Sequence, residues 1–222
     1  MTTTLSLALL HTPLLAGLPA DAHARLAAAA SARVYEPEQV IALEGDPSPE
    51  ALFVHQGLVR ARQISLEGRE HVLGYLGPGS CLNLAPALDG GPLLASLEAL
   101  QQTEIVALPG ALLRALLHEQ AEFAAAVALA LAADNRRLSG RAKELALHSV
   151  RARLAAFLLR HAEYAPPLQY WTQAAIAADI GTVRDVVGRG LRSFAEEGLI
   201  RREQGRLRIV DRARLEQAAH EE

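Results

Sequence analysis

A helix, a tight turn and a second helix are predicted for residues 172–197, and this unit constrains the fold more than any other stretch. From Thr172 to about Asp179 the residues are mostly small and apolar, so a helix formed here can lie close to a partner helix. Ile180 and Gly181 break the helical pattern, and glycine tolerates the backbone angles of a sharp turn. The two helices are therefore expected to pack against each other across a short connection.

The second helix is predicted over residues 183–197. Thr182 is a suitable N-cap because its hydroxyl can accept a backbone N–H, and Gly198 is a typical residue just past a helix end. Apolar residues recur along the helix at helical spacing, at Val183, Val186, Val187, Leu191 and Phe194. These positions are expected to form its buried face.

The opposite face of this helix carries most of its charge. Its positions are Arg184, Asp185, Gly188, Arg189 and Arg192. Arginine can bond bidentately to guanine, and an acidic side chain can accept a hydrogen bond from cytosine. The glycine among them lets another surface come close. The pattern predicts a helix that enters the major groove of DNA, with a solvated charged face as the alternative.

The composition places the chain among cytoplasmic globular proteins without a membrane segment. No apolar stretch reaches membrane-spanning length without a charge or proline, and the N-terminus lacks the basic start of a signal peptide. A single cysteine, Cys81, excludes an internal disulfide and a one-chain multi-thiolate iron–sulfur cluster. Residues 1–140 hold 8 basic and 14 acidic residues, whereas residues 141–222 hold 14 basic and 11 acidic residues. The C-terminal part is therefore expected to face a polyanion.

Short β-prone runs separated by glycines are predicted between residues 35 and 109, after one or two short helices over residues 13–33. The runs are QVIAL, ALFVHQG, LVRARQIS, EHVLGYL and EIVALP. Turn signals about every 8–12 residues are typical of an antiparallel barrel or sandwich.

One long helix is predicted from Gly110 to Leu147, because this stretch has no proline and almost no glycine. Leucines and small residues recur along it in a seven-residue pattern, at Leu117, Ala124, Ala128, Leu131, Asn135, Leu138, Ala142 and Leu145. Asn135 is a candidate for the polar contact that sets the register. The pattern predicts a parallel homodimer, with packing of the helix on its own β domain as the alternative.

Two helices and two strands are also predicted in the C-terminal part. Ser149 can cap a helix that ends before Pro166, and a last helix is expected after Asp211. Between them, two short strands are expected to turn at Gly205, with arginines around the tip at Arg201, Arg202, Arg206 and Arg208. A basic hairpin beside a helix–turn–helix is a wing, whose arginines bind phosphate rather than bases.

The elements in this order resemble the Crp/Fnr family of bacterial transcription regulators, and the resemblance covers nearly the whole chain. The family's recognition pattern, G-x-S/T-R-E-T-V-x-R-x-L, has its counterpart in GTVRDVVGRGL from Gly181 to Leu191. It is followed by EEGLI, from Glu196 to Ile200. Earlier in the chain, EGD, VHQGLV, GPGS and LDGGP match the layout of the family's β-roll.

The resemblance implies an α+β fold in three parts. These are an N-terminal antiparallel, jelly-roll-like β-roll domain (residues 1–110), a long dimerisation helix (111–148) and a winged helix–turn–helix (149–222). The implied function is that of a homodimeric activator on a palindromic promoter site, with half-sites about one helical turn apart. RNA polymerase is the implied protein partner, contacted near residues 161–167.

By the same resemblance, base and phosphate contacts fall on seven residues, Gln173, Arg184, Asp185, Gly188, Arg189, Arg192 and Arg206. Arg184 and Arg189 match the family's base contacts, and Gln173 stands where a phosphate contact is usual. Asp185 replaces the common glutamate and is one methylene shorter. Val183 replaces a serine or threonine that contacts phosphate, and it is expected to pack instead.

The effector pocket departs from the family pattern. Cyclic-nucleotide binders hold ribose with a glutamate and the cyclic phosphate with an arginine–serine pair, and these positions are Leu84, Leu94 and Ala95 here. The remaining positions of this degenerate pocket are Asn83, Leu138 and Ser139. Losing the arginine removes a charge-assisted hydrogen bond of about 1.5–3 kcal/mol, so cyclic AMP is not the expected ligand.

Three options then remain for the effector: none, an apolar molecule, or haem. A pocket filled by its own leucines would hold the dimer in the DNA-binding state, so no cofactor is the first expectation. For haem, His71 is the best-placed ligand. Cys81 is an alternative redox-sensing thiol.

A metal-dependent β-roll enzyme is the alternative from another class. Such enzymes carry clustered histidine and glutamate ligands that lie close together in sequence. Here His55 and His71 are isolated, and no nucleophile–base pair is evident. The protein is therefore not expected to be an enzyme.

Overall fold

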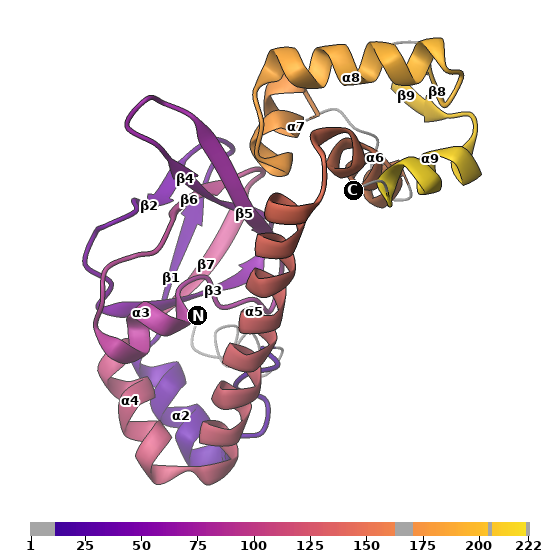
Figure 1. Ribbon diagram of the computed structural model, residues 1–222. Helices are drawn as coiled ribbons and strands as arrows, with labels where there is room; N and C mark the ends of the chain where they lie inside the picture. The colour runs from indigo at the N-terminus through magenta and orange to yellow at the C-terminus, as the bar shows by residue number, and fades with distance from the viewer. Residues whose placement is uncertain (1–11, 163–170, 204–205, 221–222) are drawn as a thin grey trace. The chain divides into compact units, whose positions relative to one another are not determined.

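The computed structural model describes residues 12–162, 171–203 and 206–220. The chain divides into two compact units (Figure 1). We call Met1–Gln63 with Leu73–Arg136 the roll unit, and Ile64–Val72 with Arg137–Glu222 the winged-helix unit. Helix α5 and strand β5 each contribute residues to both units.

Antiparallel strands form two sheets in the N-terminal part. The strands are β1 (Ser31–Tyr35), β2 (Val40–Ala42), β3 (Glu50–Gln56), β4 (Val59–Ile64), β5 (Glu70–Leu76), β6 (Ser96–Ala99) and β7 (Thr103–Pro109). One sheet has the order β1-β7-β3 and the other the order β2-β6-β4-β5. The predicted antiparallel β-roll is confirmed.

The sheet β1-β7-β3 is covered on both faces, which explains its continuous apolar runs. In β3, Leu52 and Val54 belong to the core shared with the second sheet, whereas Ala51 and Phe53 belong to a core shared with helices. Strand β7 alternates in the same way from Ile105 onward. Because successive side chains of a strand point to opposite faces, both sets are apolar.

Helices cover the outer face of that sheet. They are α2 (Ala20–Ala29), α3 (Leu84–Asp89), α4 (Gly110–Glu119) and the first part of α5 (Ala121–Leu147). Leu26 of α2, Leu113 and Leu116 of α4, and Phe123 of α5 are buried in their shared core. Figure 1 shows α2, α4 and α5 gathered at the same end of the roll unit.

Strands β1 and β6 and helix α3 of the roll unit were not predicted. Residues 31–33 were expected to be helical, but they begin β1, whose pairing with β7 runs from Ser31 opposite Ala107. Strand β6 was missed because Glu98 interrupts its apolar pattern. Glu98 is nevertheless buried, because Arg60 and Arg62 of the neighbouring β4 bind its carboxylate at 2.9 and 2.7 Å.

The prediction of one continuous helix from Gly110 to Leu147 is wrong. The chain bends by 116° between α4 and α5, at Gln120. Leu117 consequently lies on α4 and packs against the helical core, so it does not extend the α5 pattern. Within the described part of the chain no single helix is long and apolar enough to cross a membrane; α4 and α5 meet that test only as this bent pair, by length and composition.

The winged-helix unit has the predicted order of elements. They are α6 (Val150–Ala162), α7 (Gln173–Ile180), α8 (Arg184–Glu196), β8 (Ile200–Glu203), β9 (Arg206–Ile209) and α9 (Arg212–Ala219). Ser149 Oγ accepts from Ala152 N at 3.1 Å, and Asp211 Oδ1 accepts from Arg214 N at 3.0 Å. The predicted cap at Ser149 is therefore confirmed, and the last helix begins after Asp211 as predicted, with the Asp211 side chain as its cap. The predicted end of α6 before Pro166 and the turn at Gly205 lie outside the described residues.

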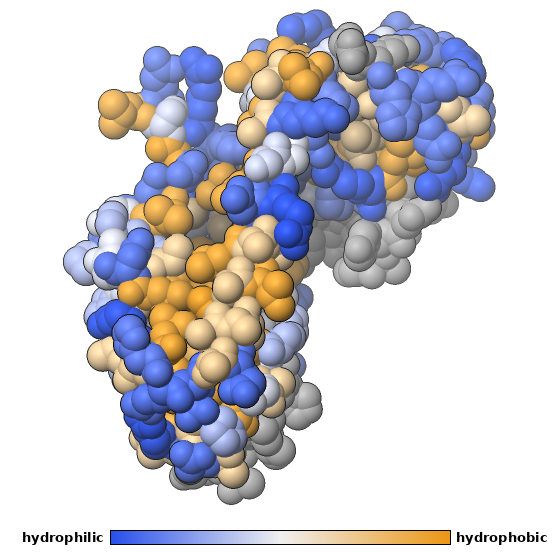
Figure 2. Space-filling view, turned by 60° about the horizontal axis from the view of Figure 1, so that its bottom comes forward, coloured by the Kyte–Doolittle hydropathy of each residue, from blue (hydrophilic) through white to orange (hydrophobic). Residues whose placement is uncertain are grey.

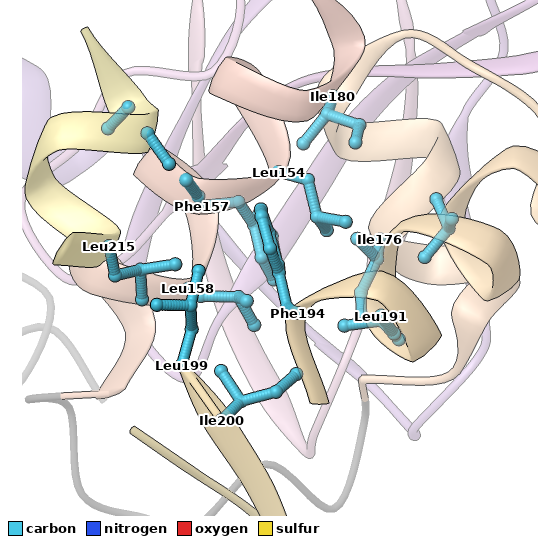
Figure 3. Close-up of a cluster of buried hydrophobic side chains, with 14 of the residues drawn as sticks. Leu154, Phe157, Leu158, Ile176, Ile180, Leu191, Phe194, Leu199, Ile200 and Leu215 are labelled. Atoms are coloured by element: carbon cyan, nitrogen blue, oxygen red, sulfur yellow. The ribbon is translucent and has the colours of Figure 1, made fainter. Parts of the chain in front are cut away.

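A single apolar core holds this unit together. Side chains from α6, α7, α8, β8 and α9 converge on it, with Phe157 and Phe194 fully buried (Figure 3). Helix α8 lies close to α6 at Gly190, where an added Cβ would be 2.6 Å from Leu154 Cδ2. Helix α8 is thus fixed on its buried side by a tightly packed contact, which leaves its other side free.

Candidate nucleic-acid interface

The turn between α7 and α8 has the predicted chemistry. Thr172 is the N-cap of α7, and its Oγ1 accepts from Ala175 N at 3.1 Å. Gly181 adopts the left-handed conformation with φ +68°, which glycine allows at little cost. Ile180 was expected to break the helix, but it is the last residue of α7 and is buried in the core.

The start of α8 differs from the prediction by one residue. Val183, not Thr182, is the N-cap, and no side chain caps this helix end. The backbone N–H of Thr182 instead donates to Ala177 O at 2.9 Å. Val183 is 47% exposed, so the expectation that it packs is also wrong. An N-terminus without a side-chain cap leaves backbone N–H groups available to an anion such as phosphate.

Helix α8 is amphipathic in the predicted sense. Val187, Leu191 and Phe194 are buried in the core. The opposite face exposes its charged residues, at Arg184, Asp185, Arg189 and Arg192. Three guanidinium groups and one carboxylate therefore occupy a single open face of one helix.

Gly188 departs from the expected exposure, because the Gln173 side chain lies over it. An added Cβ at Gly188 would be 3.2 Å from Gln173 Oε1. The exposed charged side of α8, which we call the reading face, has a hollow of about 240 Å³. Its lining residues are Gln173, Asp185, Gly188, Arg189 and Arg192. The sequence placed Gln173 only by resemblance; the structure places its amide beside the charged residues of α8.

A polar network supports the far end of α8. Arg151 of α6 binds both carboxylate oxygens of Glu197, at 2.9 and 2.6 Å, and its guanidinium lies 4.5 Å from the Phe194 ring centroid. Ser193 Oγ donates to the same carboxylate at 2.7 Å. These bonds hold the pKa of Glu197 below its ordinary value, the Arg151 hydrogen bond being the largest cause.

The wing is present as an antiparallel pair of strands, with Arg201 opposite Arg208. Arg201, Arg202 and Arg208 are exposed. Glu203 lies 3.8 Å from Arg201 and 3.4 Å from Arg208, which partly offsets their charge. Arg206 begins β9, but its side chain lies outside the described part of the structure.

Helix α5 exposes the apolar positions of the seven-residue pattern. Leu131, Leu138 and Leu145 are 37%, 48% and 40% exposed. The small and polar positions Ala128, Asn135 and Ala142 are exposed as well. In the roll unit, apolar and small side chains form a continuous band in the region of α5 (Figure 2). Phe123 and Val127 alone are buried on this helix, so the pattern continues well past the part that packs on its own core.

The positions assigned to an effector pocket have different surroundings in the structure. Asn83 is buried, its Oδ1 accepts from Leu52 N at 2.8 Å and its Nδ2 donates to Glu50 O at 2.7 Å, which gives it a structural role. Leu84 is buried on α3, and Ala95 is buried in the core between the two sheets. Leu94 is 61% exposed, so the expectation that it fills a pocket is wrong. Leu138 and Ser139 are exposed on α5, within the winged-helix unit.

A cavity of about 490 Å³ lies in the roll unit, between α5 and the segment that precedes α3, and Leu84 is the one assigned pocket position among its described lining residues. Its walls are mainly apolar, formed by Leu14, Leu76, Leu84, Ala126, Leu129 and Ala130. Ser80, Cys81 and Asp134 supply polar atoms, and no histidine is among the described lining residues. Burial raises the pKa of the Cys81 thiol to about 12, so it is protonated at neutral pH and does not have the character of a redox-sensing thiolate.

His71 belongs to the winged-helix unit and lies at the start of strand β5. Its Nδ1 lies 3.2 Å from Ala178 O, near the end of α7. Burial is the main cause of its lowered pKa, which favours the neutral ring at pH 7. His71 does not line the cavity beside α5.

Two arginines that the sequence analysis did not single out act at the same helix end. Arg141 Nη2 donates to Asp179 O at 2.6 Å, and Arg153 Nη1 donates to Ile180 O at 2.5 Å. With His71 they form a set that we call the turn clamp. Its members lie far apart in the sequence, so no local pattern signals it.

The fold and this face define a class of protein. A helix–turn–helix with a wing presents arginines on an open helix, and a β-roll with a long helix precedes it. These are the features of a DNA-binding transcription regulator with an attached sensor-type domain.

Comparisons with known proteins give the family. Residues 32–120 match the cyclic nucleotide-binding domain family and residues 152–218 match the Crp-like helix-turn-helix domain family. The chain is 32% identical over 188 residues to the cyclic AMP receptor protein of Thermus thermophilus, covering 84% of this chain and 87% of the relative. It is 27% identical over 184 residues to a CRP-like cAMP-activated global transcriptional regulator of Mycobacterium tuberculosis, covering 79% and 82%.

A solved structure agrees on the fold. The crystal structure of a putative transcriptional regulator of the Crp/Fnr family from Eubacterium rectale superposes with a TM-score of 0.80 at 23% identity, covering 94% of this chain and 98% of that one. The chain belongs to the Crp/Fnr family of transcription regulators. Its domains and relatives are those of a regulator rather than of an enzyme.

Proposed function

We propose that the protein is a homodimeric regulator that binds a palindromic DNA site through α8. The observation that carries this proposal is the open face of α8, where Arg184, Asp185, Arg189 and Arg192 are exposed opposite a buried apolar face. Buried charged residues could not reach a base. Here the guanidinium groups are free to bond bidentately to guanine, and Asp185 can accept from cytosine.

Gln173 and the wing supply the remaining contacts. Gln173 lies beside Gly188, so its amide can donate to a phosphate that borders the groove. Arg201, Arg202 and Arg208 are exposed on the wing, and we assign them and Arg206 to the phosphate backbone of the flanking duplex. Contacts of this kind raise affinity for any sequence, whereas α8 selects among sequences.

Dimerisation through α5 follows from its exposed apolar stripe. Leu131, Leu138 and Leu145 alternate with Ala128, Asn135 and Ala142, and a large–small alternation suits two parallel helices in contact. A two-fold dimer places two copies of α8 in successive major grooves on one side of DNA, which requires a palindrome.

The regulator is proposed to bind DNA without cyclic AMP, although the relatives above are named for that nucleotide. Leu84, Leu94 and Ala95 replace the glutamate, arginine and serine of the family's nucleotide contacts, and none of them can bond to ribose or phosphate. The apolar cavity beside α5 favours one alternative, regulation by an apolar organic molecule, because its volume lies in the range of ligand pockets. For haem, the cavity lacks a described histidine, and its thiol is protonated.

Activation of transcription in the cytoplasm, through contact with RNA polymerase, completes the proposal. It rests on membership of the family, because most of the stretch from 161 to 167 lies outside the described residues.

The proposal is tested by DNA selection followed by binding assays on the selected palindrome. Arg189→Ala should lose about 1–3 kcal/mol of binding free energy and lose its preference at the guanine it contacts. Arg208→Ala should weaken binding to all sequences alike and lower the salt slope by about one. Arg25→Ala, on an exposed ion pair of the roll unit, is the control and should bind as the wild type does. Full affinity and base preference in Arg189→Ala would overturn the proposal.

A further inference from the structure

The C-terminal end of α7 is satisfied by side chains from three other segments. The last carbonyls of a helix have no partner within it, and they carry the negative end of the helix dipole. The carbonyls of Ala178, Asp179 and Ile180 each accept one bond from the turn clamp, namely from His71 of the β4–β5 hairpin, Arg141 of α5 and Arg153 of α6. Two cations and one imidazole thus hold three consecutive carbonyls.

Within the turn clamp, Arg141 makes the most polar contacts. Besides Asp179 O, its guanidinium lies 3.4 Å from Val72 O, 3.2 Å from Glu144 Oε2 and 3.9 Å from the Asp179 carboxylate. Its side chain is only one-fifth exposed, and Asp179 is buried. A largely enclosed guanidinium with several fixed acceptors has one geometry, because its donors form a rigid planar fork.

Arg141 also ties α5 to the turn. Leu145, one helical turn further along α5, touches the same turn, since an added Cβ at Gly181 would be 2.7 Å from Leu145 Cδ2. One polar and one apolar contact therefore join the last two turns of α5 to Gly181. Helix α8 begins at Arg184, three residues later, so the direction in which it leaves the turn depends on how this joint is held.

We propose that Arg141 is a positioning residue that fixes the angle between α5 and α8, and thereby sets the spacing between the two half-sites that the dimer accepts. The inference rests on the proposed function, because it needs two copies joined along α5. With the joint intact, the two copies of α8 are separated by one distance. Without it, each helix–turn–helix can shift on its α5 and accept several spacings.

The experiment uses the full chain and palindromes that differ only in the number of base pairs between half-sites. The wild type should bind the palindrome with the best spacing about tenfold more tightly than palindromes with neighbouring spacings. A tenfold difference in affinity is about what one hydrogen bond to a charged group contributes. Arg141→Gln should reduce that ratio to about threefold or less while leaving binding to an isolated half-site unchanged. Arg136→Gln, an exposed arginine of the same helix, is the matched control and should keep the wild-type ratio.

A merely destabilising role for Arg141 predicts a different result, namely equal loss at every spacing with the ratio retained. That result would overturn the inference. Should Arg141→Gln not fold, Arg141→Lys replaces it, because lysine keeps the charge but cannot hold the same acceptors in one plane. A lowered ratio in that variant supports the inference and a retained ratio contradicts it. Failure of the wild type to bind any palindrome would instead contradict the proposed function.

Discussion

Two glycines on α8, two residues apart, should respond in opposite directions to replacement by alanine. An added Cβ at Gly188 would meet Gln173 Oε1 at 3.2 Å, which is the free end of a flexible side chain. An added Cβ at Gly190 would meet Leu154 Cδ2 at 2.6 Å, and Leu154 is fully buried in the core. The first neighbour can move aside, whereas the second can move only by disturbing packed side chains.

The magnitudes follow from these contacts. Alanine is better than glycine in a helix interior by about 1 kcal/mol. At Gly188 the end of the Gln173 side chain need only move by a few tenths of an ångström, so Gly188→Ala should stabilise the winged-helix unit by roughly 0.5–1 kcal/mol. At Gly190 the overpacking cost of about 1–3 kcal/mol exceeds the helix gain, so Gly190→Ala should destabilise it by roughly 1 kcal/mol.

DNA binding should separate from stability in the first variant. Gly188→Ala adds a methyl group to the reading face and displaces the Gln173 amide, so affinity for the selected palindrome should fall by about tenfold although the protein is more stable. Denaturant unfolding followed by circular dichroism measures the first quantity and fluorescence anisotropy with labelled DNA the second. A destabilised Gly188→Ala variant, or one with full DNA affinity, would refute the reasoning about this face.

Three further predictions concern the dimer, the acid stability and the effector. Leu131→Asp should convert the dimer to monomers in sedimentation velocity, because it places a charge in the exposed stripe of α5, and an intact dimer would contradict the stripe assignment. The pKa of Glu197 is lowered from 4.5, so its bond to Arg151 contributes stability above pH 4.5 that is lost as the pH falls through the folded-state pKa. Glu197→Gln should therefore make the free energy of unfolding depend less on pH in this acid range. An unchanged pH dependence would count against the network. Cyclic AMP at millimolar concentration should leave the melting temperature unchanged, since no residue at the family's phosphate position can bind it, and a clear rise would show that another part of the chain does.

Local signals sufficed for much of the winged-helix unit. The helix starts at Thr172, Ser149 and Asp211 and the turn at Gly181 depend on a few neighbouring residues, so the sequence predicts where these elements begin and end. The charged face of α8 was predictable for the same reason, because side chains three and four residues apart share one side of a helix.

Features that depend on packing between distant segments were not predictable. The bend at Gln120 lies in a stretch without proline or glycine, and it arises where α4 and α5 pack on the same core. Strand β6 could not be recognised from its own residues, because its buried Glu98 carboxylate is stabilised by two arginines of β4. The contact of the Gln173 side chain with Gly188 was likewise not predictable, because it is formed between two helices, α7 and α8.

The number of protein chains on one palindromic duplex, measured by sedimentation velocity without added ligand, tests the central claim most directly. The account predicts two chains per duplex for the wild type, and loss of that complex when the guanines read by α8 are replaced in both half-sites. A complex with a single chain, or one that persists after the guanines are replaced, would contradict it.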